Sequence, residues 1–445
     1  MEKQSNDAKK PKKQHSAPAR NWVGDNGKII EPLFADYFLS LHPMRCFQGR
    51  LFTVDGMVED EAPLKKEIYE QIRYYATTSV ARRIEHIVQA IKLACASESP
   101  EIQTDRIHVR NGTYFVDGHF TPEKEYCMNR LPIAYVPEAP APTRWLQFLN
   151  ELLYEEDIPA LQEYIGYCLL PVTKAQKMLL MVGKGGEGKS RIGLILRELF
   201  GNSMYTGSLQ KVETNRFARA DLEYKLLLVD DDMKTEALPQ TNNIKTLVTL
   251  EDKIDIERKG QQSVQGTLYV RFACFGNGSL HALYDKSNGF YRRQLLLTTK
   301  EKPVGRVDDP FLIDKMRGEK EGILLWALEG LNRLIQNNYQ FTISERTTAN
   351  LKEAMEQGNN ILGFLKSEGY FEIRQGAKCK STDFYKVYER WCLDNLEKPL
   401  AASTFIHNQK SLGIVYDDKC IGTNRGFHNV DVDLFLPVDV PSPWD

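Results

Sequence analysis

Residues 183–190 read Gly183-Lys184-Gly185-Gly186-Glu187-Gly188-Lys189-Ser190, a complete G-x-x-x-x-G-K-[ST] phosphate loop. An apolar run, Met178 to Val182, precedes the loop and predicts a buried parallel strand. After the loop, apolar residues recur at the spacing of one helical face: Ile192, Ile195, Leu196, Leu199 and Phe200. A strand, a glycine loop and a helix N-terminus surround a triphosphate with backbone N–H groups. Lys189 adds a positive charge for the β- and γ-phosphates, and Ser190 can ligate Mg²⁺.

A second apolar run ends in acidic residues, as a nucleotide site requires. Leu226 to Val229 is followed by Asp230, Asp231 and Asp232, and Asp230 lies 41 positions after Lys189. We interpret Asp230 as a ligand of Mg²⁺, acting through water. We interpret Asp231 as the carboxylate that orients or deprotonates the attacking water. The sequence therefore predicts an α/β domain that takes ATP and Mg²⁺.

A third candidate strand, 272–276, ends at Asn277, whose amide could reach the γ-phosphate or the attacking water. Arg292 and Arg293 follow shortly, before another apolar run. Either arginine could project into the nucleotide of a neighbouring subunit and stabilise charge during phosphoryl transfer. The alternative is a surface pair that bonds to local carboxylates.

Residues 253–272 have alternating side chains on both sides of a polar tip with two glycines, which predicts a β-hairpin. The tip would present Arg258 and Lys259, both of which are residue types that bind phosphates. A solvated hairpin tip would have the same pattern.

The composition of the 445-residue chain limits the classes of protein to consider. Its formal net charge is −2, so any affinity for nucleic acid has to come from local patches. No apolar run approaches the ~20 residues of a membrane span, and the N-terminus has no secretory signal. The eight cysteines form no C-x-x-C pair, which argues against a zinc site and a disulfide framework. We expect a cytoplasmic protein without membrane contact.

The order of these motifs resembles a superfamily 3 helicase, in particular the helicase half of phage and plasmid primase-helicases of the P4/D5 type. Five segments carry the resemblance: 183–190, 215–231, 244–260, 272–277 and 290–297. Lys189 and Arg293 are only 104 positions apart. The family's primase domain has no counterpart in residues 28–136, so the chain looks like the replication initiator-helicases of phage satellites and mobile cassettes.

The resemblance implies an AAA+-related core and a homo-hexameric ring with ATP bound between subunits. By position, Lys189, Ser190, Asp230, Asp231 and Asn277 match the phosphate-loop, Mg²⁺, water-activating and sensor residues. Lys259 matches the hairpin lysine that contacts single-stranded DNA in the ring channel. Arg293 is the better match to the arginine that reaches the neighbour, with Arg292 second.

Three positions depart from the family pattern. The family usually has Glu where Asp231 stands, and the shorter side chain could slow turnover. No proline follows Asn277 three residues later, and Gly260 follows Lys259 where viral relatives have histidine.

The C-terminal region has the order of helices and strands of a winged helix. Residues 382–395 predict a helix, Ser403 caps the next, and residues 414–421 and 427–430 predict strands around a wing that contains Arg425. Lys410 lies on the helix that would enter a major groove. We expect duplex origin DNA to bind here; a protein-docking winged helix is the alternative.

These observations divide the chain into a disordered basic tail (1–27), an N-terminal α/β domain and linker (28–142), the ATPase domain (143–345) and the winged helix (346–445). The tail could contact nucleic acid or only solubilise the chain. The N-terminal domain could be an oligomerisation collar or a docking domain. The favoured function is an ATP-dependent DNA helicase and replication initiator of a mobile element. The alternative is an ATP-switched origin-binding or loader protein without processive unwinding.

Overall fold

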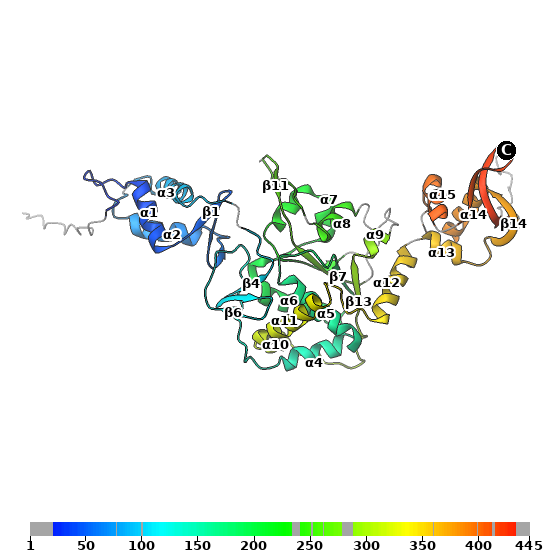
Figure 1. Cartoon of the computed structure of the whole chain (residues 1–445), viewed down its shortest axis with the longest axis horizontal. Coiled ribbons are helices and arrows are strands. Elements are labelled where there is room, and N and C mark those ends of the chain that lie inside the picture. Colours follow the sequence, from blue (N-terminus) through cyan, green and yellow to red (C-terminus); the bar gives the residue numbers. More distant parts are fainter. Residues whose placement is uncertain are drawn as a thin grey trace, which may run out of the picture. The chain divides into compact units, whose positions relative to one another are not determined.

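The computed structural model describes residues 21–76, 78–98, 101–233, 241–250, 252–260, 262–277, 288–358, 360–397, 399–411 and 414–432 (Figure 1). The chain divides into two compact units, one of residues 1–137 with 201–203, and one of residues 138–200 with 204–445. Residues 1–20 of the expected basic tail lie outside the described residues. Trp22 is fully buried, so ordered structure begins before the expected boundary at residue 28.

The first unit combines helices with two small antiparallel sheets. Its elements are α1 (Glu31–Leu41), β1 (Arg45–Phe47), β2 (Arg50–Thr53), β3 (Gly56–Met57), α2 (Ala62–Ile72), α3 (Val80–Ala94), β4 (Arg106–Val109), β5 (Gly112–Phe115) and β6 (Phe120–Thr121). Helix α3 buries Ile87, Val88 and Ile91, one apolar stripe, against Phe34 and Phe38 of α1 and their neighbours. The mixed α/β character expected of this region is confirmed.

The Asn111-Gly112 pair is a residue combination typical of a two-residue hairpin turn, and the β4–β5 hairpin forms here with its turn one residue earlier. Val109 pairs with Gly112, so Arg110 and Asn111 form the loop. Asn111 turns its side chain to the main chain of Tyr135, with two hydrogen bonds of 2.8 and 2.9 Å. A Cβ on Gly112 would lie 2.1 Å from the Thr121 carbonyl oxygen, so the glycine permits close approach of β6.

The second unit is built on a five-stranded parallel sheet with the spatial order β13-β7-β12-β9-β8. The strands are β7 (Met178–Val182), β8 (Met204–Thr206), β9 (Leu227–Met233), β12 (Arg271–Gly276) and β13 (Gln294–Thr298). When the five strands are numbered by their order along the chain, their spatial order is 5-1-4-3-2. Strands β7 and β12 are buried throughout, which explains their continuous apolar sequence.

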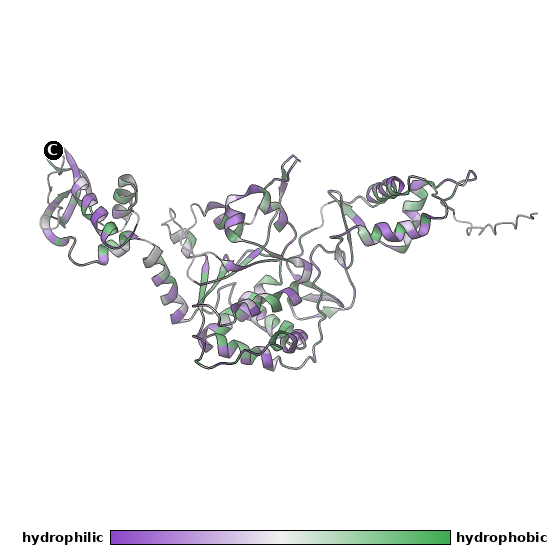
Figure 2. Ribbon diagram, turned by 180° about the vertical axis from the view of Figure 1, so that it is seen from behind, coloured by the Kyte–Doolittle hydropathy of each residue, from purple (hydrophilic) through white to green (hydrophobic). Residues whose placement is uncertain are grey.

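Helices cover this sheet (Figure 2). The helices of this unit are α4 (Thr143–Leu152), α5 (Ile158–Cys168), α6 (Lys189–Phe200), α7 (Leu209–Thr214), α8 (Asn242–Val248), α9 (Asn288–Tyr291), α10 (Leu312–Arg317), α11 (Lys320–Gln336) and α12 (Glu345–Gly358), with 3-10 turns η1 (Glu155–Asp157) and η3 (Arg216–Leu222); η2 (Gly201–Ser203) falls in the first unit. Glycines let α5 and α11 approach closely: a Cβ on Gly166 would lie 2.3 Å from the Ala327 carbonyl oxygen. The five apolar residues predicted for α6 are all buried.

A short hairpin of β10 (Ile254–Ile256) and β11 (Val264–Gly266) stands between α8 and β12. It confirms the hairpin predicted for residues 253–272, although the paired part is shorter. The segment between β11 and β12 is buried at Leu268 and Val270 without forming a strand.

The C-terminal part consists of α13 (Asn360–Lys366), β14 (Glu372–Lys380), α14 (Ser381–Asp394), α15 (Ala402–Ser411), β15 (Tyr416–Ile421) and β16 (Asn424–Asp431). Its sheet is antiparallel with the order β14-β16-β15. Phe364, Phe384, Tyr388, Phe405 and Phe427 form its core. Strand β14 was not predicted from the sequence. Ile421 pairs with Asn424, so the turn between the last two strands is tighter than expected.

Candidate functional site

The phosphate loop joins the carboxyl end of β7 to the first residue of α6. Three of its glycines have positive φ angles, 109° at Gly185, 80° at Gly186 and 120° at Gly188. Residues with a side chain rarely adopt this conformation, so these positions require glycine. A Cβ on Gly183 would lie 2.2 Å from the Thr299 hydroxyl oxygen, which gives the fourth glycine a packing role. The predicted loop geometry is therefore present.

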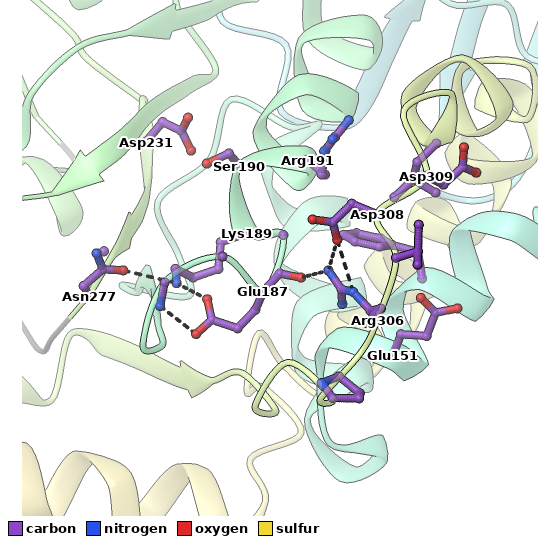
Figure 3. A pocket seen from close by; sticks show the side chains of 18 of the residues that line it. Glu151, Glu187, Lys189, Ser190, Arg191, Asp231, Asn277, Arg306, Asp308 and Asp309 are labelled. Carbon is purple, nitrogen blue, oxygen red and sulfur yellow. Dashed lines mark hydrogen bonds and ion pairs between the residues drawn. The ribbon is translucent and has the colours of Figure 1, made fainter.

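The loop encloses a buried ion pair between two of its own residues. Lys189 is 7% exposed and Glu187 is 3% exposed. The Lys189 ammonium donates to Glu187 Oε2 at 2.8 Å, and the Gly185 amide donates to Glu187 Oε1 at 2.7 Å (Figure 3). Burial disfavours the carboxylate of Glu187, but these hydrogen bonds outweigh it and lower the pKa below its ordinary value. Glu187 is thus an anion inside the loop.

Asn277 lies where the sequence predicts it, directly after β12. Lys189 Nζ is 3.5 Å from Asn277 Oδ1, so the amide faces the loop (Figure 3). Because β7 and β12 are parallel neighbours, their carboxyl ends meet at one edge of the sheet. That edge is where open parallel sheets bind ligands.

The acidic end of β9 differs from the expectation by one residue. Asp231 and Asp232 line the cavity above the loop, and Figure 3 shows Asp231 close to Ser190. Asp230, expected to hold Mg²⁺, is instead buried and accepts a hydrogen bond of 2.8 Å from the Leu209 amide. Burial raises the pKa of Asp230; the Leu209 bond opposes this, and Asp232 and Asp231 add to it.

A β-bulge explains this difference. Asp230 pairs with Cys274, but Met233 pairs with Gly276, so β9 contains one residue more than β12 over this stretch. A bulge changes the direction in which the following side chains point. Asp231 and Asp232 are both exposed, which a regular strand of alternating faces would not allow. The run contains three consecutive aspartates, so the sequence alone does not show which of them faces the cavity.

The cavity has a volume of about 700 Å³, which lies within the range for small-molecule sites. Two arginines that were not among the predicted site residues, Arg144 and Arg306, also line it; Figure 3 shows Arg306 beside Asp308. Arg306 donates to the Glu187 carbonyl oxygen at 3.0 Å and to Asp308 at 3.1 Å. No motif marks Arg306, because its approach to the loop depends on how residues 300–311 fold back after β13.

Arg292 and Arg293 lie just before β13, at its amino end. Strand β13 runs parallel to β7, so both arginines lie at the edge of the sheet opposite the phosphate loop. They are not part of their own chain's cavity. Arg292 is exposed, whereas Arg293 is half-buried and donates to the Gly289 carbonyl oxygen. Surface access therefore favours Arg292, the reverse of the sequence-based ranking.

At the hairpin the two predicted cations differ. Arg258 forms an ion pair with Glu223, which is 4% exposed, so its guanidinium is already used inside the protein. Lys259 is exposed at the tip beside Gly260, whose φ is 75°. Arg216 of η3 forms a further ion pair, 3.1 Å long, with Glu257. The hairpin is thus held by one ion pair to η3 and one to Glu223, the residue after η3, and Lys259 extends beyond them.

The C-terminal candidates are only partly described. The structure gives the backbone of Lys410 within α15, but its side chain lies outside the described part. Arg425 is exposed on β16 and lies 3.5 Å from Asp418. Two such exposed charges hold each other weakly.

The donors in the cavity fit a magnesium ion that is bound mainly by a nucleotide. In the described residues, no group of three or more His, Cys, Asp or Glu could hold a metal ion. Mg²⁺ usually takes one or two carboxylates together with substrate phosphates and water. Ser190 and Asp231 meet that requirement. Within the part of the chain described, every helix is too short or too polar to cross a bilayer.

Comparisons with known proteins add two family matches and a fold. The family model "D5 N terminal like" matches residues 31–153. A family of unknown function, DUF5906, matches residues 181–293, which include the phosphate loop, Asp231 and Asn277. Neither covers half of the chain. No curated protein matches.

Among solved structures, the apo A form of the NrS-1 C-terminal region has a TM-score of 0.50 at 12% identity, over 90% of this chain and 100% of that one. A second apo structure of this region (305–718) has a TM-score of 0.49 at 12% identity, over 90% and 99%. At this identity the likeness concerns the fold alone. The D5 match is the finding that bears on relationship, and it concerns residues 31–153.

Proposed function

We propose that this chain is an ATP-dependent DNA helicase and replication initiator of a mobile genetic element, related to superfamily 3. One observation carries the proposal: Lys189, Ser190, Asp231 and Asn277 converge at the carboxyl edge of a parallel sheet with the strand order 5-1-4-3-2. This order and the position of the loop support an AAA+-type core.

The residues that line the cavity would have different roles toward a bound ATP. The amides of the loop and Lys189 would bind the β- and γ-phosphates. Ser190 and Asp231 would hold Mg²⁺, which neutralises charge on the phosphates when bound. Asp232 would then activate the attacking water, and Asn277 would orient that water. Phe148, Val307 and Leu312, which also line the cavity, would offer apolar surface to the base.

The position of the arginines supports a ring. Because Arg292 and Arg293 lie at the sheet edge away from their own phosphate loop, they can act only on the nucleotide of another subunit. A homo-hexamer with ATP at each interface provides that geometry. The exposed Lys259 of each hairpin would then face single-stranded DNA in the channel. The C-terminal part, with its α-β-α-α-β-β order, would bind duplex origin DNA as a winged helix. We place the protein in the cytoplasm.

A second function has specific support. Glu187 holds the lysine of the loop, and aspartates stand where a glutamate usually activates water. Both features suit a protein that binds ATP as a switch and loads other proteins at an origin. Such a protein would need neither rapid turnover nor unwinding.

Strand displacement on a forked duplex separates the two functions. With ATP and Mg²⁺ we expect displacement by the full chain, together with hydrolysis that single-stranded DNA stimulates. Light scattering with an ATP analogue and DNA should show a hexamer. A monomer under those conditions, or binding of ATP without displacement, would favour the switch and reject the helicase.

A further inference from the structure

The fifth residue of the phosphate loop, Glu187, occupies the position of an anion. Its carboxylate accepts hydrogen bonds from the Gly185 amide at 2.7 Å and from Lys189 Nζ at 2.8 Å. Only 3% of Glu187 is exposed, so the carboxylate lies inside the loop and not over its surface (Figure 3).

These two donors are the type that a phosphate group uses in such a loop. Backbone amides and the lysine of the loop bind phosphate oxygens. A carboxylate presents two oxygens with a negative charge to the same donors. Two anions a few ångströms apart in a buried site repel strongly, so one excludes the other. Glu187 and a bound phosphate therefore cannot share Lys189 and Gly185 in this arrangement.

We propose that Glu187 is a built-in competitor of the nucleotide phosphates, which holds Lys189 and Gly185 until a phosphate displaces it. The inference rests on the proposed function, since it assumes that the loop binds a nucleotide. The inference adds that the loop limits its own affinity for the nucleotide, because part of the binding free energy is used to move the Glu187 carboxylate out of the loop.

The cavity offers the displaced carboxylate other partners. Arg144, Arg191 and Arg306 line the same cavity, and Arg306 already donates to the main chain of Glu187 at 3.0 Å. A rotation of the Glu187 side chain toward these arginines would keep its negative charge near a cation. The lowered pKa agrees with a carboxylate that stays charged at neutral pH and competes as an anion.

A purely structural role for Glu187 makes the opposite prediction. If the carboxylate only braces the loop for its ligand, neutralising it should loosen the loop and weaken binding. If it competes, neutralising it should strengthen binding. The sign of the change therefore decides between the two roles.

The experiment is calorimetric titration of the full chain with inorganic pyrophosphate and with ADP, for wild type, Glu187→Gln and Glu187→Asp. We expect Glu187→Gln to bind both ligands about 10-fold more tightly, a gain of about 1.4 kcal/mol. Glu187→Asp keeps the charge on a shorter side chain and should fall between. Equal or weaker binding by folded Glu187→Gln, or a gain by Glu187→Asp alone, would overturn the proposal.

Glu301→Gln is the matched control. Glu301 pairs with Lys184 of the same loop at 2.5 Å, but both side chains are more than 70% exposed and lie outside the cavity. Its loss removes the same charge without freeing the phosphate site, so affinity should stay unchanged. An equal gain in Glu301→Gln would mean that net charge, not competition, controls binding.

The double variant Lys189→Ala/Glu187→Gln separates this inference from the proposed function. If wild type binds pyrophosphate and the double variant does not, the loop is a phosphate site, and a missing gain in Glu187→Gln rejects the competitor alone. If neither wild type nor Glu187→Gln binds any of the ligands, the phosphate site and the inference both fail.

Discussion

The phosphate loop and the β10–β11 hairpin are both charged turns that contain glycine, yet their lysines have opposite surroundings. Lys189 is 7% exposed and bonded to Glu187, whereas Lys259 is exposed at a tip. A buried cation with fixed donors around it suits a small anion of defined shape. An exposed cation on a flexible stem suits a polymer whose phosphates pass by.

Burial also decides how each region responds to mutation. In the loop a lost charge leaves a buried partner, so function and stability change together. At the hairpin tip a lost charge leaves nothing buried behind. Arg258 is the exception, because its partner Glu223 is buried. The comparison is therefore between charges in buried pairs and exposed charges, and five substitutions in four experiments test it.

The largest effect is expected from Lys189→Ala. It should weaken nucleotide binding by about 100-fold or more and lower the free energy of unfolding by about 1–2 kcal/mol, because Glu187 loses its cation and keeps the Gly185 amide or has to turn toward Arg306. Titration with ADP and urea denaturation measure the two. In Lys189→Ala/Glu187→Gln, stability should return while binding stays weak. A fully stable single variant would contradict the buried pair.

Asp231→Ala and Asp230→Ala form the next pair, since adjacent carboxylates lie in different environments. Asp231→Ala should reduce ATP hydrolysis by about 100-fold at unchanged stability, because the exposed carboxylate serves only the cavity. Asp230→Ala should keep most of the hydrolysis but lose about 1–2 kcal/mol of stability, because the Leu209 amide loses its acceptor. Steady-state hydrolysis and thermal melting of both variants give the answer. The reverse result would restore the assignment made from sequence.

Arg258→Ala should lower the free energy of unfolding by about 2 kcal/mol, because the buried carboxylate of Glu223 would lose its ion pair with Arg258. Urea denaturation of the full chain measures the change. Glu223→Gln/Arg258→Ala should recover part of the loss. An unchanged midpoint in the single variant would show that the hairpin does not depend on this ion pair.

Lys259→Ala should have the smallest effect on stability, within about 0.5 kcal/mol. Its affinity for single-stranded DNA should fall, and the salt dependence of binding should decrease by about 0.7 per lost phosphate contact. Fluorescence anisotropy at several salt concentrations measures both. Lys253→Ala, an exposed lysine at the base of the same hairpin, is the matched control. Equal losses in the two variants would point to general charge and not to the tip.

Much of the local structure could be predicted. The apolar run before residue 183 forms β7, and the spaced apolar residues after it form the buried face of α6. These signals are local, because the periodicity of a strand or helix can be recognised within a few consecutive residues. The glycines of the loop are also a local signal, because their positive φ angles are a property of the loop itself.

Other features depended on residues far away in the sequence. The bulge on β9 is defined by pairing with β12, 44 positions further on at Cys274, so no local pattern reveals that Asp231 and not Asp230 faces the cavity. Strand β14 is exposed along most of its length and has no apolar alternation to mark it. Arg306 reaches the loop only because residues after β13 turn back over it.

The residue order alone specified the glycine-rich loop, its strand and helix, and the types of side chain that the proposed function needs. Folding selected which of those side chains serve the cavity, since burial and long-range pairing determine where each one points. Asp230 accepts a hydrogen bond from the first amide of α7 and Arg258 forms an internal ion pair, while the Glu187 carboxylate lies inside the loop. A motif identifies the chemical groups that are present, and the packing of distant segments determines which of them remain free to react.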